Sequence, residues 1–227
     1  MPCIDYVLRM RIDSWHHITD ISASHAGGYS QTSPYIRAEE DVRAAIAAVA
    51  WPVGAADFTI YPESGKKRGE GNGVVPIKRG FTSELLKRGW TLEHKAPKSQ
   101  EAEASGKGAL PGAFDCHLDF ADGSTAPFVV EWETGNISSS HRAINRIALG
   151  IFRGYVSGGL LVLPSARLAP FLTDRIGNEP ELRPYHVVWS NWSFPGDAYL
   201  GIVAVEHDGV SRDVPRIPKG KDGRALG

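Results

Sequence analysis

The sequence predicts an α/β fold in which helices flank a central mixed β-sheet. Two strand-like runs at 114–120 and 128–133 enclose a turn with Asp122-Gly123, which is a strong signal for a hairpin. An amphipathic helical pattern follows, and then the apolar run 160–163, which is typical of a strand covered on both faces. The order strand, strand, helix, strand is that of an α/β core.

The first part of the chain contains two further predicted helices. The segment 39–49 begins with acidic residues and continues with alanines, and it ends before Trp51-Pro52. The segment 81–88 is amphipathic and is followed by Gly89, a usual residue after a helix end. We also expect a short strand at 57–61, a glycine-rich charged loop at 63–73 and a polar connection at 95–108.

Helices and strands alternate in the second half of the predicted fold. A helix from about 138 to 156 has apolar residues at helical spacing, with serines before it that offer N-caps. Gly158-Gly159 end this helix. A second helix is expected at 166–176, and the remaining strands are expected at 187–189 and 200–206.

Length and composition favour one globular domain. The chain has 227 residues, of which 42% are hydrophobic and 22% charged. We expect a single domain over 1–227, with 1–62 as an N-terminal extension of helix and strand and 206–227 as a basic tail. No run approaches the roughly 20 apolar residues of a membrane span. Cys3 and Cys116 are expected to be free thiols, and the protein is expected in the cytoplasm.

Charge is unevenly distributed along the chain. The formal net charge is −1, but the stretch from Lys66 to Lys98 holds nine Lys or Arg against three Glu. That stretch therefore carries a charge of +6, and the remainder carries −7. A basic stretch of this kind is either a surface for nucleic acid or an ordinary solvated face, and the sequence leaves both interpretations open.

Two acidic residues share one face of the predicted strand 128–133. Residues two apart on a strand point the same way, so Glu131 and Glu133 lie on one face with Cα atoms about 6.6 Å apart. The apolar neighbours indicate an interior strand, where paired carboxylates need a partner that neutralises them. Mg²⁺ suits this role because it prefers oxygen ligands, and such a site activates water for phosphodiester hydrolysis.

The preceding strand offers two candidate partners for Glu131. Asp115 and Asp119 lie four residues apart, so both point to the same face. A tight turn at Asp122-Gly123 would bring Glu131 near residue 114 or 115, whereas a wider loop would bring it opposite Asp119. Geometry alone leaves this choice open.

The hairpin resembles the PD-(D/E)XK nuclease motif, which has an aspartate, a short hairpin, an acid, one residue and a third polar group. More narrowly, the runs Leu118-Asp119-Phe120 and Val130-Glu131-Trp132-Glu133-Thr134-Gly135-Asn136 are similar to type II restriction endonucleases of the BglII and BamHI group. The resemblance covers roughly 70–205, and its specific identities lie in 114–136. It implies a restriction-endonuclease-like core.

The resemblance also implies roles for individual residues. Asp119 and Glu131 would bind Mg²⁺, and Glu133 would be the third catalytic residue, in the place where this superfamily usually has lysine. The BamHI-like members are similar to this chain in having an acid there. The segment after the catalytic strand would contact DNA through Asn136, Ser138, Ser139, Ser140 and Arg142.

The expected function is Mg²⁺-dependent, sequence-specific cleavage of double-stranded DNA by a homodimer, with any cognate methyltransferase a separate protein. Another nuclease of this fold, acting in DNA repair or recombination, would use the same acids. A non-catalytic DNA-binding module would lack them, and the paired acids of a glycosidase normally flank a sugar instead of sharing one strand. The sequence does not define the recognition site or the number of metal ions.

Overall fold

The computed structural model describes residues 10–64, 70–97, 111–123, 125–173 and 176–219 of the chain. Its centre is a six-stranded sheet with the strand order β1-β7-β6-β5-β4-β3. Strands β5, β6 and β7 run parallel, whereas β1 is antiparallel to β7, and β4 is antiparallel to both β5 and β3. The predicted α/β class with a mixed central sheet is confirmed.

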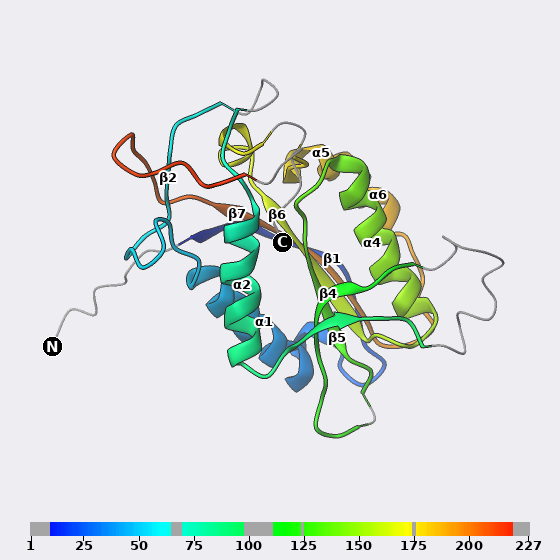
Figure 1. The fold of residues 1–227 in the computed structure, drawn as a ribbon. Helices are drawn as coiled ribbons and strands as arrows, with labels where there is room; N and C mark the ends of the chain where they lie inside the picture. Colours follow the sequence, from blue (N-terminus) through cyan, green and yellow to red (C-terminus); the bar gives the residue numbers. More distant parts are fainter. Residues whose placement is uncertain (1–9, 65–69, 98–110, 124, 174–175, 220–227) are drawn as a thin grey trace, which may run out of the picture.

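Helices cover both faces of this sheet, with α1 and α2 on one side and α4, α5 and α6 on the other (Figure 1). The sheet strands are β1 (Arg11–Ile21), β3 (Thr91–His94), β4 (Phe114–Leu118), β5 (Phe128–Trp132), β6 (Gly158–Pro164) and β7 (Ala198–Glu206). A separate ribbon pairs β2 (Thr59–Ile60) with β8 (Gly209–Val210). The helices are α1 (Ser33–Ala47), α2 (Val75–Lys87), α4 (Ile137–Phe152), α5 (Glu179–Leu182) and α6 (His186–Trp189), with 3₁₀ turns η1 (Tyr29–Gln31), η2 (Ala169–Phe171) and η3 (Arg183–Tyr185).

The N-terminal segment is part of the central fold. Within the expected extension 1–62, β1 pairs with β7 as an edge strand, and α1 buries its apolar face in the main core. Helix α1 begins at Ser33, earlier than predicted. The Thr32 side chain accepts a hydrogen bond from the Tyr35 N–H, and Pro34 occupies the first turn, where proline is tolerated.

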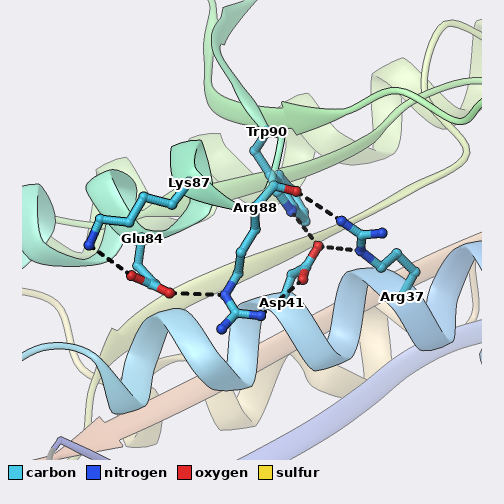
Figure 2. A network of polar contacts seen from close by, with 6 residues as sticks. All are labelled: Arg37, Asp41, Glu84, Lys87, Arg88 and Trp90. Carbon is cyan, nitrogen blue, oxygen red and sulfur yellow. Dashed lines mark hydrogen bonds and ion pairs between the residues drawn. The ribbon is translucent and has the colours of Figure 1, made fainter.

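A buried aspartate on α1 ties this helix to the end of α2 (Figure 2). Asp41 accepts hydrogen bonds from Arg37 Nε at 2.7 Å and from Trp90 Nε1 at 3.0 Å. Arg88 NH1 lies 3.5 Å from Asp41 Oδ1, and Arg88 Nε donates to Glu84 at 3.1 Å. Arg88, one of the basic residues of the 66–98 stretch, is therefore engaged between the two helices.

Strands β4 and β5 form the predicted hairpin, with a loop over 119–127 between them. The paired residues are Cys116 with Val130, His117 with Val129 and Leu118 with Phe128. The loop is centred on Gly123, which has a left-handed φ of 62°. The Asp-Gly signal thus marks the middle of a wide loop and not a two-residue turn.

Strand β5 is an interior strand, as predicted, and all its residues are buried. Val130 and Trp132 belong to the core beneath α1 and α2, whereas Val129 belongs to the core beneath α4. Because strand side chains alternate between faces, Glu131 points to the α4 side together with Val129. The fold therefore places Glu131 between the sheet and α4.

Two predicted elements are wrong. The run 187–189 is the helix α6 and not a strand, with Trp189 buried and the two valines exposed. A short apolar run fits either periodicity, so its neighbours in space decide the outcome. The helix predicted at 166–176 is reduced to η2, because Leu172 is extended and forms an isolated β-bridge with Asn72.

The expected tail is partly integrated into the fold. Strand β8 lies within 206–227, and Ile217 is fully buried. Cys116 is a buried free thiol, and burial raises its pKa to about 12. Cys3 lies outside the described residues, as do Lys66, Lys67 and Arg68 of the predicted glycine-rich loop and residues 98–108 of the polar connection. Within the described ranges, none of the helices has the length and apolarity that crossing a membrane requires.

Candidate active site

A pocket of about 560 Å³ opens beside β4, β5 and the first half of α4. Three acids and three basic side chains line it: Asp115, Glu131, Glu133, Lys78, Arg142 and Arg146. The acids come from the hairpin strands, whereas the basic residues come from α2 and α4. This is a concave, strongly polar site in which opposite charges meet at short range.

Asp115 is the aspartate that faces Glu131. The register that pairs Cys116 with Val130 also sets Asp115 opposite Glu131. Asp115 Oδ1 lies 2.6 Å from Lys78 Nζ, and Asp115 Oδ2 accepts a hydrogen bond from the Trp132 N–H at 2.8 Å. Both carboxylate oxygens are therefore fixed in position at the wall of the pocket.

The expectation that Asp119 lies beside Glu131 is wrong. Asp119 follows the end of β4, its side chain is 70% exposed, and it lies 3.3 Å from His117 Nε2. It does not line the pocket. The physical reason is the register of the hairpin: the wide loop begins at residue 119, so that residue has no partner on β5.

Glu131 is the most deeply placed acid of the pocket. Its side chain is 6% exposed and forms an ion pair with Arg146 of α4. Burial raises the pKa of Glu131 to about 8, and the Arg146 guanidinium acts in the opposite direction. Burial outweighs the guanidinium, so the Glu131 carboxyl group holds its proton more firmly than an ordinary glutamate does.

Glu133 follows the end of β5 and lines the same pocket, as predicted from the strand alternation. Its Oε1 accepts a hydrogen bond from the Gly135 N–H at 2.5 Å. Burial raises the pKa of Glu133, and the backbone N–H groups of Gly135 and Thr134 oppose this effect. Among the described residues, no basic side chain forms an ion pair with Glu133.

Lys78 and Arg146 were not among the predicted site residues. Lys78 lies within the basic stretch 66–98 noted in the sequence, but only the packing of α2 brings it to Asp115. Arg146 lies one helical turn after Arg142, so the pair shares one face of α4. That spacing is the signal that could have indicated a second arginine in the site.

The five residues predicted to contact DNA differ in accessibility. Asn136 is the N-cap of α4, and its side chain accepts a hydrogen bond from the Ser139 N–H. Asn136, Ser138 and Arg142 are exposed, and Ser139 lines the pocket. Ser140 is fully buried, so its hydroxyl does not reach the surface from which DNA would approach.

A second hollow of about 370 Å³ adjoins the pocket and shares Lys78, Asp115 and Thr134 with it. Arg79 and Thr82 of α2 line its other part. The two hollows together form a path along the hairpin and α2, with basic and hydroxyl groups on the α2 side.

The acids of the pocket have the chemistry of a divalent metal site. Carboxylate oxygens are the ligands that Mg²⁺ prefers, and Glu131 Oε1 is a buried oxygen without a hydrogen bond of normal geometry. Nevertheless, no three His, Cys, Asp or Glu side chains in the described part of the chain are grouped closely enough to hold a metal. Lys78 and Arg146 form ion pairs with two of the three carboxylates, so basic groups now stand where the acids would meet a cation.

Comparison with known proteins identifies close relatives. The family model for restriction endonuclease BamHI matches residues 15–224. The chain is 45% identical to the type II restriction enzyme OkrAI of Oceanobacter kriegii over 82% of this chain and 88% of that one. It is 33% identical to the type II restriction enzyme BamHI of Bacillus amyloliquefaciens, over 82% of each chain. The structure of restriction endonuclease BglII complexed with a DNA 16-mer shares the fold, with a TM-score of 0.52 and 11% identity over 86% of this chain and 79% of that one.

The fold and the carboxylate pocket, taken with these matches, define the protein as a restriction endonuclease of type II. Within that class the chain belongs to the restriction endonuclease BamHI family. Enzymes of this family generally depend on a divalent metal. The resemblance inferred from the hairpin motif is therefore confirmed.

Proposed function

We propose that the chain is a Mg²⁺-dependent restriction enzyme that acts in the cytoplasm as a single nuclease domain and cuts both strands of DNA as a homodimer. The observation that carries the proposal is the juxtaposition of Asp115 and Glu131 on adjacent strands, in a pocket with Glu133 and several basic groups. Membership of the BamHI family supports the same conclusion.

Asp115 and Glu131 are the proposed metal ligands, with Asp115 in the role that the sequence motif gave to Asp119. A bound Mg²⁺ would polarise the phosphodiester and lower the pKa of a coordinated water. The chain's part is to hold the two carboxylates in place. Lys78 and the Trp132 N–H fix the two oxygens of Asp115, so this side chain pays little conformational entropy on binding.

Glu133 is the proposed acceptor of the proton from the attacking water. One of its oxygens is held by the Gly135 N–H, which leaves the other available. Burial raises its pKa, and a carboxylate with a raised pKa is a better proton acceptor near neutral pH. A protonated lysine in this position could not accept a proton. The acid found here therefore has a different role from the lysine of the common motif.

The proposed path of the DNA backbone follows the two adjoining hollows. The residues at this surface that offer guanidinium and hydroxyl groups are Arg79 and Thr82 of α2 and Ser139 and Arg142 of α4. Such groups bind phosphates and fix the register of a duplex. Asn136 and Ser138 are exposed at the start of α4, and we assign them contacts with DNA, whereas burial argues against Ser140.

The proposed homodimer follows from the reaction. A break in both strands at a two-fold symmetric sequence needs two active sites related by a two-fold axis. One chain supplies one pocket with a single Asp115–Glu131 pair, so a second copy would cut the second strand.

Incubation of supercoiled plasmid with the protein tests the proposal. We expect discrete linear fragments with Mg²⁺ and intact plasmid with EDTA. The variant Glu131→Gln, which keeps the size of the side chain, should leave the plasmid intact under both conditions. Cleavage by Glu131→Gln at the wild-type rate, or a continuous smear in place of bands, would contradict the proposed site or the proposed specificity.

A further inference from the structure

Arg146 is held at the centre of the pocket by three contacts. Its NH2 group forms the ion pair with Glu131, and its NH1 group donates a hydrogen bond to the Pro111 carbonyl at 3.2 Å. The guanidinium also lies over the Phe114 ring, 5.5 Å from the ring centroid. The side chain is 18% exposed, and its Nε is buried without a hydrogen-bond partner.

This guanidinium occupies the place that the proposed metal needs. Arg146 NH2 contacts Glu131 Oε1, so a cation bound to this carboxylate would stand close to the guanidinium in the same pocket. Two positive charges at one buried carboxylate would also repel each other strongly, since interactions are weakly screened there. This repulsion favours the release of Arg146 from Glu131 when a divalent cation is bound.

A displaced Arg146 remains in a pocket suited to phosphate. Arg142 and Ser139 lie on the same face of α4 and line the same space. A planar guanidinium binds phosphate oxygens in a bidentate manner, and the buried Nε–H of Arg146 has no hydrogen-bond partner where it now stands. DNA phosphate is thus the natural new partner for the released side chain.

The other basic residues of the pocket do not have this property. Lys78 contacts Asp115, whose second oxygen is already bound by a backbone N–H, and both side chains are partly exposed. Arg142 is exposed, and its NH2 group donates a hydrogen bond to the Ser139 hydroxyl at 3.4 Å. Arg146 is the basic side chain of the described pocket that stands directly on the buried acid.

We propose that Arg146 couples metal binding to DNA binding: it neutralises Glu131 in the metal-free enzyme and becomes a ligand of DNA phosphate when a divalent cation takes its place. This inference rests on the proposed function, because it requires Glu131 to be a metal ligand. Coupling of this kind is reciprocal, so metal strengthens DNA binding and DNA strengthens metal binding by the same factor. The device compensates the buried carboxylate when no metal is bound and keeps Arg146 away from DNA until the metal is present.

The first test needs no metal. Glu131→Gln removes the charge that holds Arg146, so it should release the arginine in EDTA. The probe is a DNA fragment that the wild type cuts when metal is present. In EDTA we expect Glu131→Gln to bind this fragment about tenfold more tightly than the wild type does. Adding Arg146→Met, which keeps an apolar stem over Phe114, should abolish this gain, whereas Arg146→Met alone should change the affinity in EDTA less than twofold.

A gain that survives in the double variant would overturn the proposal, because it would come only from removing the repulsion between Glu131 and DNA. Arg146→Lys serves as a second variant if the methionine disturbs the fold, since it keeps the charge but not the planar fork. In combination with Glu131→Gln, Arg146→Lys should retain only part of the gain in DNA affinity. Full retention would likewise contradict a bidentate phosphate contact.

The second test uses the metal alone. Calorimetric titration of the DNA-free protein with Ca²⁺ should show that Arg146→Met binds the ion several-fold more tightly than the wild type, because the competing cation is gone. Arg153→Gln, at the C-terminal end of the same helix and outside the pocket lining, is the control and should leave the Ca²⁺ affinity unchanged. Equal Ca²⁺ affinity of Arg146→Met and wild type would overturn the proposal. If Glu131→Gln is inactive but none of these affinities changes, the proposed role of Arg146 is rejected and the proposed active site stands. Cleavage by Glu131→Gln would instead reject the proposed active site.

Discussion

At the scale of single residues, the chemistry of the pocket depends on which aspartate faces Glu131. Asp115 is held by Lys78 and by a backbone N–H at the pocket wall, whereas Asp119 is largely exposed and lies against His117. A carboxylate assists a cation bound at Glu131 only if it lies within ligand distance of that cation. We therefore expect cleavage to depend on Asp115 and not on Asp119, although both lie on the same hairpin.

Asp115→Asn should lower the rate of plasmid cleavage by about a thousandfold or more, because loss of a metal ligand removes several kcal/mol of transition-state stabilisation. Asp119→Asn should keep a rate within a few-fold of the wild type. Single-turnover cleavage at saturating Mg²⁺ measures both. Loss of activity in Asp119→Asn with full activity in Asp115→Asn would return the site to the end of β4.

At the scale of elements, the position of Lys78 depends on how α2 is held against α1. Lys78 lies in the first half of α2, and the contacts of Asp41 with Arg88 and Trp90 fix the end of that helix (Figure 2). Asp41 is buried, so its removal leaves the Trp90 N–H without its acceptor in an apolar setting. The tie therefore contributes both to stability and to the placement of the basic side of the pocket.

Asp41→Ala should lower the free energy of unfolding by about 1–3 kcal/mol, the cost of leaving a buried donor unsatisfied. The control is Glu39→Ala on the same helix, which removes the more exposed pair of Glu39 with Arg43 and should cost less than the loss of Asp41. Urea unfolding followed by circular dichroism compares the two. Equal losses in both variants would contradict a special role for Asp41.

The contact of β6 with α4 gives a second test at this scale. A Cβ on Gly159 would lie 2.8 Å from Ile147 Cγ2 and 2.8 Å from Val129 Cγ2, both in the core beneath α4. Gly159→Ala should therefore destabilise the protein by about 1–3 kcal/mol through overpacking. Gly196→Ala, where no atom lies within 4 Å of the added Cβ, should change the unfolding midpoint little. A stable Gly159→Ala variant would show that α4 moves freely away from the sheet.

At the scale of the whole molecule, the proposed homodimer requires a surface that a second copy can cover. Helix α6 exposes two neighbouring valines, Val187 at 64% and Val188 at 53%, and Tyr185 beside them is also exposed. Exposed apolar side chains that lie together often mark an association surface. The α4 side of the sheet, to which α6 belongs, is therefore the face from which we expect the second copy to approach (Figure 1).

Sedimentation equilibrium should show a dimer for the wild type and a monomer for the double variant Val187→Asp with Val188→Asp. Two charges in an apolar interface are expensive to bury, so association should weaken by at least about a hundredfold. Val53→Asp is the control, since Val53 is 84% exposed elsewhere on the molecule. A wild type that is monomeric both free and on DNA would contradict the proposed assembly.

The sequence by itself determined the features that depend on local periodicity. Alternation along 128–133 put Glu131 on a different face from Val130, and the structure confirms this placement. The apolar run at 160–163 is a fully buried strand, and the helical spacing after Asn136 is the amphipathic helix α4. These properties follow from the backbone geometry of each element, so residues close in sequence are enough to predict them.

Only the tertiary structure decided the features that join distant segments. The choice of Asp115 over Asp119 depended on how a wide loop closes, and the acid–base pairs Lys78–Asp115 and Arg146–Glu131 depended on how α2 and α4 pack on the sheet. The helical outcome of 187–189 has the same origin. Loop closure costs change slowly with length, and packing selects among the registers that local patterns allow, so these contacts are properties of the folded chain.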